Sequence, residues 1–142
     1  MLLKTKYHGE IEVAENDVLH FGHGIPGFLD EKEFVLLSLE EGSPFSILQS
    51  KKTSELGFVV VNPFLFFKDY EFDLGEADKE LLSLEKEEDV VVWTILTLKE
   101  TFEESTANLQ APIIVNSKTK KAKQIIINNP SLRTKHKILT NI

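Results

Sequence analysis

Residues 22–27 have the spacing of a phosphate-binding loop. They read G-H-G-I-P-G after a short apolar run, and dinucleotide-binding loops read G-x-G-x-x-G. In such loops the following helix offers its first backbone N–H groups to the pyrophosphate. Here the Pro-Gly pair disfavours a helix start, and the next apolar segment, residues 34–39, is typical of a strand. We therefore reject a nucleotide site and expect a glycine loop in which Ile25 and Phe28 close over the core.

The histidines are the residues that could bind a metal ion. His20 and His23 lie around a predicted strand end, where their spacing does not place them on a common face. No acidic residue stands at a recognised ligand spacing from them. The chain contains no cysteine, which excludes disulfides, a thiol nucleophile and zinc sites built on thiolates. We expect neither a metal site nor a cofactor.

Acidic side chains are abundant between residues 71 and 89, and paired carboxylates can perform acid–base catalysis. The acids of residues 71–80, Glu80 included, alternate with spacers as on a solvated surface. No G-x-S-x-G nucleophile motif is present. We therefore predict that the chain is not an enzyme. We interpret the segment as a negative surface that attracts a basic partner and repels RNA. The residues that we assign to this negative surface are Glu71, Asp73, Glu76, Asp78, Glu85, Glu87, Glu88 and Asp89.

Charge is divided unevenly along the chain. All 23 acidic residues precede residue 105, together with 9 of the 16 basic residues, and the other 7 basic residues follow it. Two explanations remain open: the basic end packs against the acidic body, or two surfaces bind different partners. The lysines of residues 118–123 form a basic turn without an aromatic side chain. Nucleic-acid binding needs a wider basic field with aromatic platforms, so we expect no direct contact with nucleic acid.

The stretch at residues 106–127 is the clearest structural element. Residues 111–115 and 124–127 are rich in Ile and Val, and residues 116–120 between them are polar. This pattern predicts a β-hairpin. The apolar residues run together instead of alternating, which indicates strands covered on both faces. Pro112 has no backbone donor, so it should mark a strand start or an edge.

Further short strands are predicted along the rest of the chain, with a single helical candidate at residues 75–88 that Asp73 or Asp78 could cap. Together they favour a mainly β, single-domain antiparallel β-barrel-like fold with one or two short helices. We expect one domain over residues 1–142, of which about residues 130–142 form a loosely held basic tail. The strands are predicted at residues 2–7, 11–13, 18–21, 34–39, 45–49, 57–62 and 90–98.

The aromatic segment at residues 64–70 must lie partly in the core, and we expect Tyr70 to be the residue that is partly exposed, because its hydroxyl suits an interface. No signal peptide is visible at the N-terminus. No apolar run approaches the roughly 20 residues of a membrane-spanning helix. We therefore expect a cytoplasmic protein without membrane contact.

Three blocks carry a resemblance to a known family. They are H-F-G-H-G-I-P-G-F, then I-L-Q-S followed by F-V-V-V-N-P-F-L-F-F-K-D-Y-E-F-D, and T-A-N-L-Q-A-P with its hairpin. In this order they resemble the flagellar assembly factor FliW, and the similarity covers nearly the whole chain. The resemblance implies a compact β-barrel-like domain and a non-enzymatic cytoplasmic regulator of flagellum assembly.

The resemblance also implies two protein partners. One is CsrA, the small RNA-binding repressor of flagellin translation, and holding it would relieve the repression. The other is flagellin, bound as a chaperone binds its client before secretion. Two other readings remain open: a generic acidic protein-binding module, and a small-ligand-binding barrel.

The matching blocks and the acidic segment supply the candidate partner-binding residues. Asn108 has a second explanation, because a buried amide side chain needs hydrogen bonds and could serve the hairpin instead. We expect the acidic residues to dock beside the basic RNA surface of CsrA. The candidates are Gly24, Ile25, Pro26, Gly27, Phe28, Asn62, Pro63, Tyr70, Glu71, Asp73, Glu76, Asp78, Asn108, Gln110 and Pro112.

Overall fold

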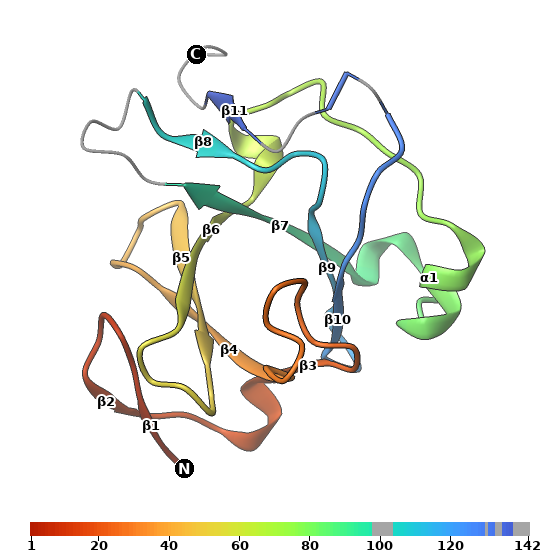
Figure 1. Ribbon diagram of the computed structural model, residues 1–142. Helices are drawn as coiled ribbons and strands as arrows, with labels where there is room; N and C mark the ends of the chain where they lie inside the picture. The colour runs from red at the N-terminus through yellow and green to blue at the C-terminus, as the bar shows by residue number, and fades with distance from the viewer. Residues whose placement is uncertain (98–103, 130, 133–134, 138–142) are drawn as a thin grey trace.

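Seven strands close into a barrel in the computed structural model, which describes residues 1–97, 104–129, 131–132 and 135–137 (Figure 1). Within this part of the chain, neighbouring barrel strands are antiparallel except where β10 meets β3 in parallel and closes the ring. The strands in barrel order are β3 (Val18–Phe21), β4 (Glu33–Ser38), β5 (Phe45–Ser50), β6 (Gly57–Val61), β7 (Val90–Thr97), β9 (Ile113–Asn116) and β10 (Lys121–Gln124). The predicted mainly β, barrel-like fold is confirmed.

The barrel interior is filled by one face of each strand. Phe21 and Phe34 meet edge to face with their ring centroids 5.3 Å apart, and both are fully buried. Such pairs stabilise a core beyond the area they bury. The cluster around them contains Leu19, Ile25, Leu48, Val60, Ile113, Val115 and Ala122.

The outer face of the barrel is covered by three further layers. The hairpin of β1 (Leu2–Lys4) and β2 (Glu10–Glu12) covers β3 and β4. The helix α1 (Glu76–Leu81) and the residues around it cover β7 and β9. The aromatic segment after β6 packs on β5 and β6 together with β8 (Thr106–Ala107). Strands buried on both faces have no polar side to show, and this explains the unbroken apolar runs in the sequence.

A buried glutamine joins the N-terminal hairpin to the barrel. Gln49 is fully buried on β5, and its Oε1 accepts a hydrogen bond from the Lys6 backbone N–H at 2.9 Å. Its Nε2 donates to the carbonyls of Ser54 and Leu56, each at 3.1 Å, in the β5–β6 loop. Hydrogen bonds on both ends of the amide offset the free-energy cost of burying it.

The predicted hairpin is confirmed, with one shift. β9 pairs with β10 in antiparallel register, and Pro112 directly precedes β9 as expected. The second strand begins at Lys121 instead of residue 124. The turn is shorter because Lys120 takes a left-handed conformation with φ of +66° and reverses the chain early.

The predicted helix at residues 75–88 is much shorter than expected. α1 ends at Leu81, and Ser83 adopts φ of +55°, a left-handed conformation that stops a helix. Gly75 occupies the N-cap position without a side-chain hydrogen bond, so the prediction that Asp73 or Asp78 caps the helix is wrong. Three short 3₁₀ turns complete the described elements, η1 (Glu15–Asp17), η2 (Pro63–Leu65) and η3 (Glu87–Asp89).

The predicted basic tail lies partly outside the described residues, at 130, 133–134 and 138–142. Two of its residues form β11 (His136–Lys137), which pairs antiparallel with β8. The chain near its C-terminal end therefore extends the sheet beyond the barrel (Figure 1).

Candidate functional site

The glycine loop between β3 and β4 seals one end of the barrel. Ile25 is 2% exposed and belongs to the barrel core. The Phe28 N–H donates to the Ile25 carbonyl at 2.6 Å, and Gly27 has φ of +87°, so residues 25–28 form a tight turn with Pro26 and Gly27 at its tip. Proline followed by a glycine with positive φ is typical of a type II turn. The prediction that Ile25 closes over the core is confirmed, whereas Phe28 is 41% exposed and its ring meets that of Phe58 edge to face with the centroids 5.4 Å apart. Pro26 and Gly27 are exposed.

Gly24 allows the backbone conformation of this loop. Its φ is +70°, and a Cβ atom at this position would lie 2.4 Å from the Leu29 carbonyl oxygen. A side chain would therefore meet backbone that cannot easily move. Of the five candidates in this block, Gly24 and Ile25 hold the loop, and the other three form an exposed tip.

A carboxylate fastens the end of the same loop to the barrel wall. Glu31 accepts hydrogen bonds from the Ser50 hydroxyl and from the Thr53 hydroxyl, the latter at 2.6 Å. Partial burial acts to raise the pKa of Glu31, but the Ser50 and Thr53 hydrogen bonds and the nearby Lys52 charge outweigh it and lower that pKa below its ordinary value. The ionised form of Glu31 thus favours the folded loop.

Asn62 and Pro63 shape a turn that exposes apolar side chains. Asn62 is the N-cap of η2, and its Oδ1 accepts a hydrogen bond from the Phe64 N–H at 3.0 Å. Pro63 at the first position of the turn lacks a donor that would be unpaired there. This local geometry leaves Phe64 43% exposed and Leu65 62% exposed.

The prediction that Tyr70 is partly exposed is wrong. Tyr70 is 7% exposed, and its hydroxyl donates a hydrogen bond of 2.6 Å to the Leu109 carbonyl. Its ring lies between those of Phe64 and Phe72, with centroid distances of 5.8 and 5.4 Å. Burial raises the pKa of the Tyr70 hydroxyl. The hydroxyl serves an internal bond, and Phe64 and Leu65 are the exposed apolar residues of this segment.

The acidic stretch that follows alternates between solvent and core. Glu71 and Asp73 are exposed, whereas Phe72 and Leu74 pack against the cluster beneath α1. Alternate side chains of an extended segment point to opposite sides, so the two carboxylates share the outer side. Glu76 is also exposed and lies 3.5 Å from the Lys79 ammonium.

Asp78 differs from the other acidic candidates because it is partly buried and its partner lies on a distant strand. Its Oδ1 lies 2.7 Å from the Nζ of Lys123 on β10, and both side chains are partly buried. Asp89, at the end of η3, lies 3.7 Å from Lys118 in the same way. Two lysines of the basic turn thus pack against acidic residues of the chain, as the first explanation of the charge asymmetry predicts.

Two grooves flank the acidic stretch. One, of about 590 Å³, is lined among others by Phe64, Leu84 and Val90 together with Glu85 and Glu87. The other, of about 750 Å³, lies between residues 71–78 and residues 125–129. Ile126 on its far wall is 75% exposed. Carboxylates next to exposed apolar side chains form a surface suited to a basic protein partner.

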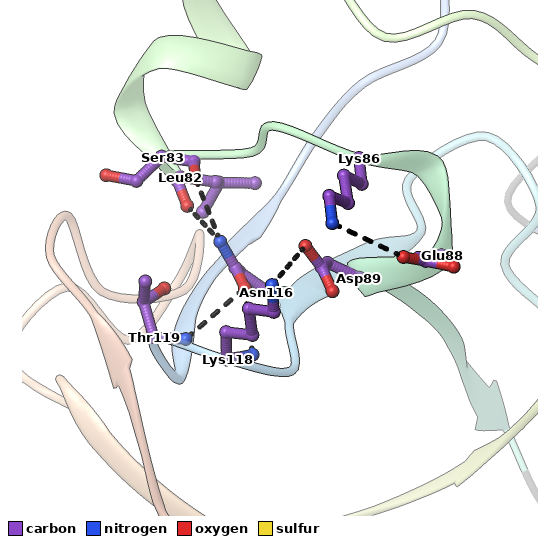
Figure 2. Close-up of polar contacts among 8 residues, drawn as sticks. All are labelled: Leu82, Ser83, Lys86, Glu88, Asp89, Asn116, Lys118 and Thr119. Carbon is purple, nitrogen blue, oxygen red and sulfur yellow. Dashed lines mark hydrogen bonds and ion pairs between the residues drawn. The ribbon is translucent and has the colours of Figure 1, made fainter.

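The junction between α1 and the β9–β10 hairpin depends on one residue that sequence reasoning did not select. Asn116 is 2% exposed, and its Nδ2 donates to the Leu82 carbonyl at 2.9 Å and the Ser83 carbonyl at 3.1 Å (Figure 2). Its Oδ1 accepts from the N–H groups of Lys118 and Thr119. The available signal was a polar residue that directly ends an all-apolar strand.

The remaining candidates lie in the segment before and at the start of β9. Asn108 is half-buried, and its Oδ1 accepts a hydrogen bond from the Ala111 N–H at 3.0 Å, so its side chain serves the chain itself. The carbonyls of Gln110 and Pro112 accept from Ile127 and Ile125 at 2.8 and 3.0 Å. Gln110 and Pro112 thus bind the backbone of Ile125 and Ile127, which line the larger groove.

The described residues contain no group of three side chains placed to hold a metal ion, and no described helix is long and apolar enough to cross a membrane. At the barrel end opposite the glycine loop, a hollow of about 410 Å³ is lined mostly by apolar side chains, among them Leu19, Leu36 and Trp93, with Asp17 and Lys120 also contributing.

Comparison with known proteins gives a consistent result. The family model described as FliW protein matches residues 2–138. The chain is 54% identical over 138 residues to the flagellar assembly factor FliW of Bacillus subtilis, covering 97% of this chain and 96% of that protein. It is 49% identical over 138 residues to that of Geobacillus kaustophilus, covering 97% and 95%. A crystal structure of the flagellar assembly factor FliW superposes with a TM-score of 0.91 at 48% identity, covering 98% of this chain and 97% of that one.

Proposed function

The chain belongs to the FliW family of flagellar assembly factors and so has a role in flagellum assembly, and we propose that it fills this role as a cytoplasmic regulator without enzymatic activity. In this role the chain acts by binding other proteins. In this proposal it binds CsrA and relieves the repression of flagellin mRNA. It also binds flagellin, and accumulating flagellin frees CsrA again.

The observation that carries this proposal is the exposed acidic stretch with apolar neighbours. Glu71, Asp73 and Glu76 are exposed. The exposed side chains of Phe64 and Ile126 line the two grooves together with Glu71 and Asp73. An RNA-binding repressor carries a basic surface for the phosphate backbone. A negative surface attracts that basic surface, and once docked it repels RNA within a Debye length of about 8–10 Å at ordinary ionic strength.

The first experiment is size-exclusion chromatography of the purified chain with CsrA, followed by the same mixture with flagellin added. We expect CsrA to co-elute and flagellin to release it. If neither protein co-elutes, the proposed partners are wrong, and the acidic surface serves another protein. If CsrA co-elutes and flagellin does not displace it, the exchange between partners is wrong.

A charge variant tests whether the acidic stretch is responsible. We expect the triple variant Glu71→Gln, Asp73→Asn, Glu76→Gln to weaken CsrA binding by about tenfold or more, because it removes three negative charges from one surface. Asp78 is left unchanged, since its ion pair with Lys123 supports the fold. Binding is measured by isothermal titration calorimetry.

A matched control keeps the change in net charge and moves it elsewhere. The variant Glu10→Gln, Glu41→Gln, Glu55→Gln removes three exposed carboxylates from the N-terminal hairpin, the β4–β5 turn and the β5–β6 loop. It should bind CsrA almost as the unaltered chain does. Equal losses in both triple variants would show that only the overall charge matters, and the local docking surface would then be refuted.

A further inference from the structure

The larger groove lies between two segments that are far apart in the sequence. One wall is the stretch that leads into α1, and the other is the segment that follows β10, and the two run side by side (Figure 1). The volume of about 750 Å³ lies within the range of clefts that bind ligands. Its acidic lining residues are Glu71, Asp73 and Asp78.

One wall presents an open edge of backbone directly after β10. The N–H groups of Ile125 and Ile127 donate to the carbonyls of Pro112 and Gln110, so alternate residues bond to the same side. In such a pairing the N–H and C=O of the residue between them point to the other side. Among the described residues, the backbone of Ile126 makes no hydrogen bond, and its side chain is 75% exposed.

The opposite wall also has free backbone groups. Residues 71–74 make no backbone hydrogen bond to any described residue. Phe72 and Leu74 anchor this segment in the cluster beneath α1, so it is held in place although its polar backbone is unpaired. Glu71 and Asp73 project from its outer side, two residues apart.

We propose that this groove binds an extended basic peptide segment of a partner protein by strand addition. The peptide pairs its backbone with the open edge at Ile126 and directs Lys or Arg side chains at alternate positions toward Glu71 and Asp73. Alternate residues of a strand are about 6.6–6.8 Å apart, which matches the spacing of two carboxylates at positions i and i+2. An apolar residue between the basic ones covers Ile126.

The free backbone groups and the carboxylates of the two walls favour a basic peptide over a nucleic acid or an acidic peptide. Strand addition supplies affinity through main-chain hydrogen bonds and specificity through alternate side chains. A nucleic acid offers phosphates, which the carboxylates repel, and an acidic peptide is repelled for the same reason. The inference deepens the proposed protein-binding function and rests on it, because it uses the same acidic stretch.

The test uses a short fluorescent peptide in which Lys and Val alternate, with binding to the full chain measured by fluorescence anisotropy. Two further peptides have the same sequence with every second backbone amide N-methylated, and they differ in which of the two alternating sets of amides is methylated. We expect the first peptide to bind and methylation in one phase to weaken binding by at least about tenfold. Equal binding of all three peptides would mean that charge alone attracts them and would overturn strand addition.

A chain variant provides the complementary test. Ile126→Pro removes the open N–H at a position where the described residues do not use it, and we expect a loss of at least about tenfold in peptide affinity. Ile126→Val keeps the N–H and should bind normally. Circular dichroism and thermal unfolding establish that both variants fold. If Ile126→Pro does not fold, the methylated peptides and the unaltered chain still decide the question.

The outcomes separate this inference from the proposed function. Peptide binding without CsrA co-elution would support the groove and contradict the proposed partner. CsrA co-elution with no binding of the alternating peptide would support the proposed function and overturn the inference. If Ile126→Pro lost peptide binding but kept its affinity for CsrA, the groove would not be part of the CsrA-binding surface. That result would overturn the claim that the groove contributes to the proposed function.

Discussion

At the residue scale, several residues that looked like partner contacts hold the backbone instead. Gly24 has no room for a side chain, Tyr70 bonds to the Leu109 carbonyl, and Asn108 bonds to the Ala111 N–H. Such residues affect binding through the fold. Substituting them therefore tests stability, whereas Glu71 and Asp73 are exposed and can test binding directly.

The tight site at Gly24 gives a prediction for stability. Gly24→Ala should lower the free energy of unfolding by more than about 2 kcal/mol, because a left-handed φ disfavours alanine and the new methyl group would collide with the Leu29 backbone. Gly22→Ala is the control. It has a permissive φ and open space around it, so its effect should stay within about 0.5 kcal/mol.

Urea unfolding followed by tryptophan fluorescence measures both glycine variants. Trp93, which lines the hollow at the opposite end of the barrel, is the single tryptophan of the chain and reports on the barrel. Similar midpoints for Gly24→Ala and Gly22→Ala would contradict the close contact with Leu29.

At the scale of elements, short segments are stable because distant side chains tie them to the barrel. A six-residue helix such as α1 is far too short to be stable in isolation. Asn116 bonds the two carbonyls that follow α1, and Lys123 pairs with Asp78 on the helix. The position of the acidic stretch therefore depends on the β9–β10 hairpin.

Removing the Asn116 side chain should release this junction. We expect Asn116→Ala to lower the free energy of unfolding by about 2–3 kcal/mol, because it leaves the buried Leu82 carbonyl without a partner. Native-state hydrogen exchange should show faster exchange of the Leu82 and Leu84 amides while β5 remains protected. Asn16→Ala, at an exposed position in η1, is the control and should change neither. Uniform acceleration over the whole barrel would mean that α1 does not open separately.

At the scale of the whole molecule, closure of the barrel joins two strands that are far apart in the sequence. β3 near the N-terminus pairs with β10 about a hundred residues later, and the glycine loop covers the end of the barrel. The Glu31 carboxylate holds that loop to the β5–β6 loop through Ser50 and Thr53. The protonation of one group thereby affects the stability of the whole fold.

The stability should depend on pH in a direction that follows from Glu31. Its pKa is lowered in the folded state from the ordinary value of 4.5. A lowered pKa stabilises the fold above the unfolded-state value, and this stabilisation is lost as the pH falls through the folded-state value. The free energy of unfolding should therefore fall between about pH 5 and about pH 3, and less steeply in Glu31→Gln.

Urea unfolding at a series of pH values checks this. The control is Glu55→Gln, which removes an exposed carboxylate without a hydrogen bond among the described residues. Between these pH values, the pH dependence of its free energy of unfolding should be closer to that of the unaltered chain than the pH dependence of Glu31→Gln is. A Glu31→Gln profile parallel to the unaltered one would show that the Glu31 hydrogen bonds do not contribute.

The sequence by itself determined the local features of this protein. Runs of Ile and Val predicted the hairpin and most strands, and the Pro-Gly pair argued against a helix start after the glycine loop, because these preferences depend on neighbours along the chain. The barrel-like class followed from the number and spacing of the strands, and the three blocks predicted the family.

Only the tertiary structure decided which residues are free to meet a partner. The residues that end α1 are bonded by Asn116, the Tyr70 hydroxyl is bonded by Leu109, and Asp78 is paired with Lys123, so each depends on a segment far away in the sequence. Hydrophobic periodicity carries no information about such partners, because an acidic residue makes the same contribution to the sequence pattern whether its side chain faces water or a lysine. The open edge at Ile126 likewise depends on tertiary structure, because it is defined by the pairing of the neighbouring residues with the segment before β9.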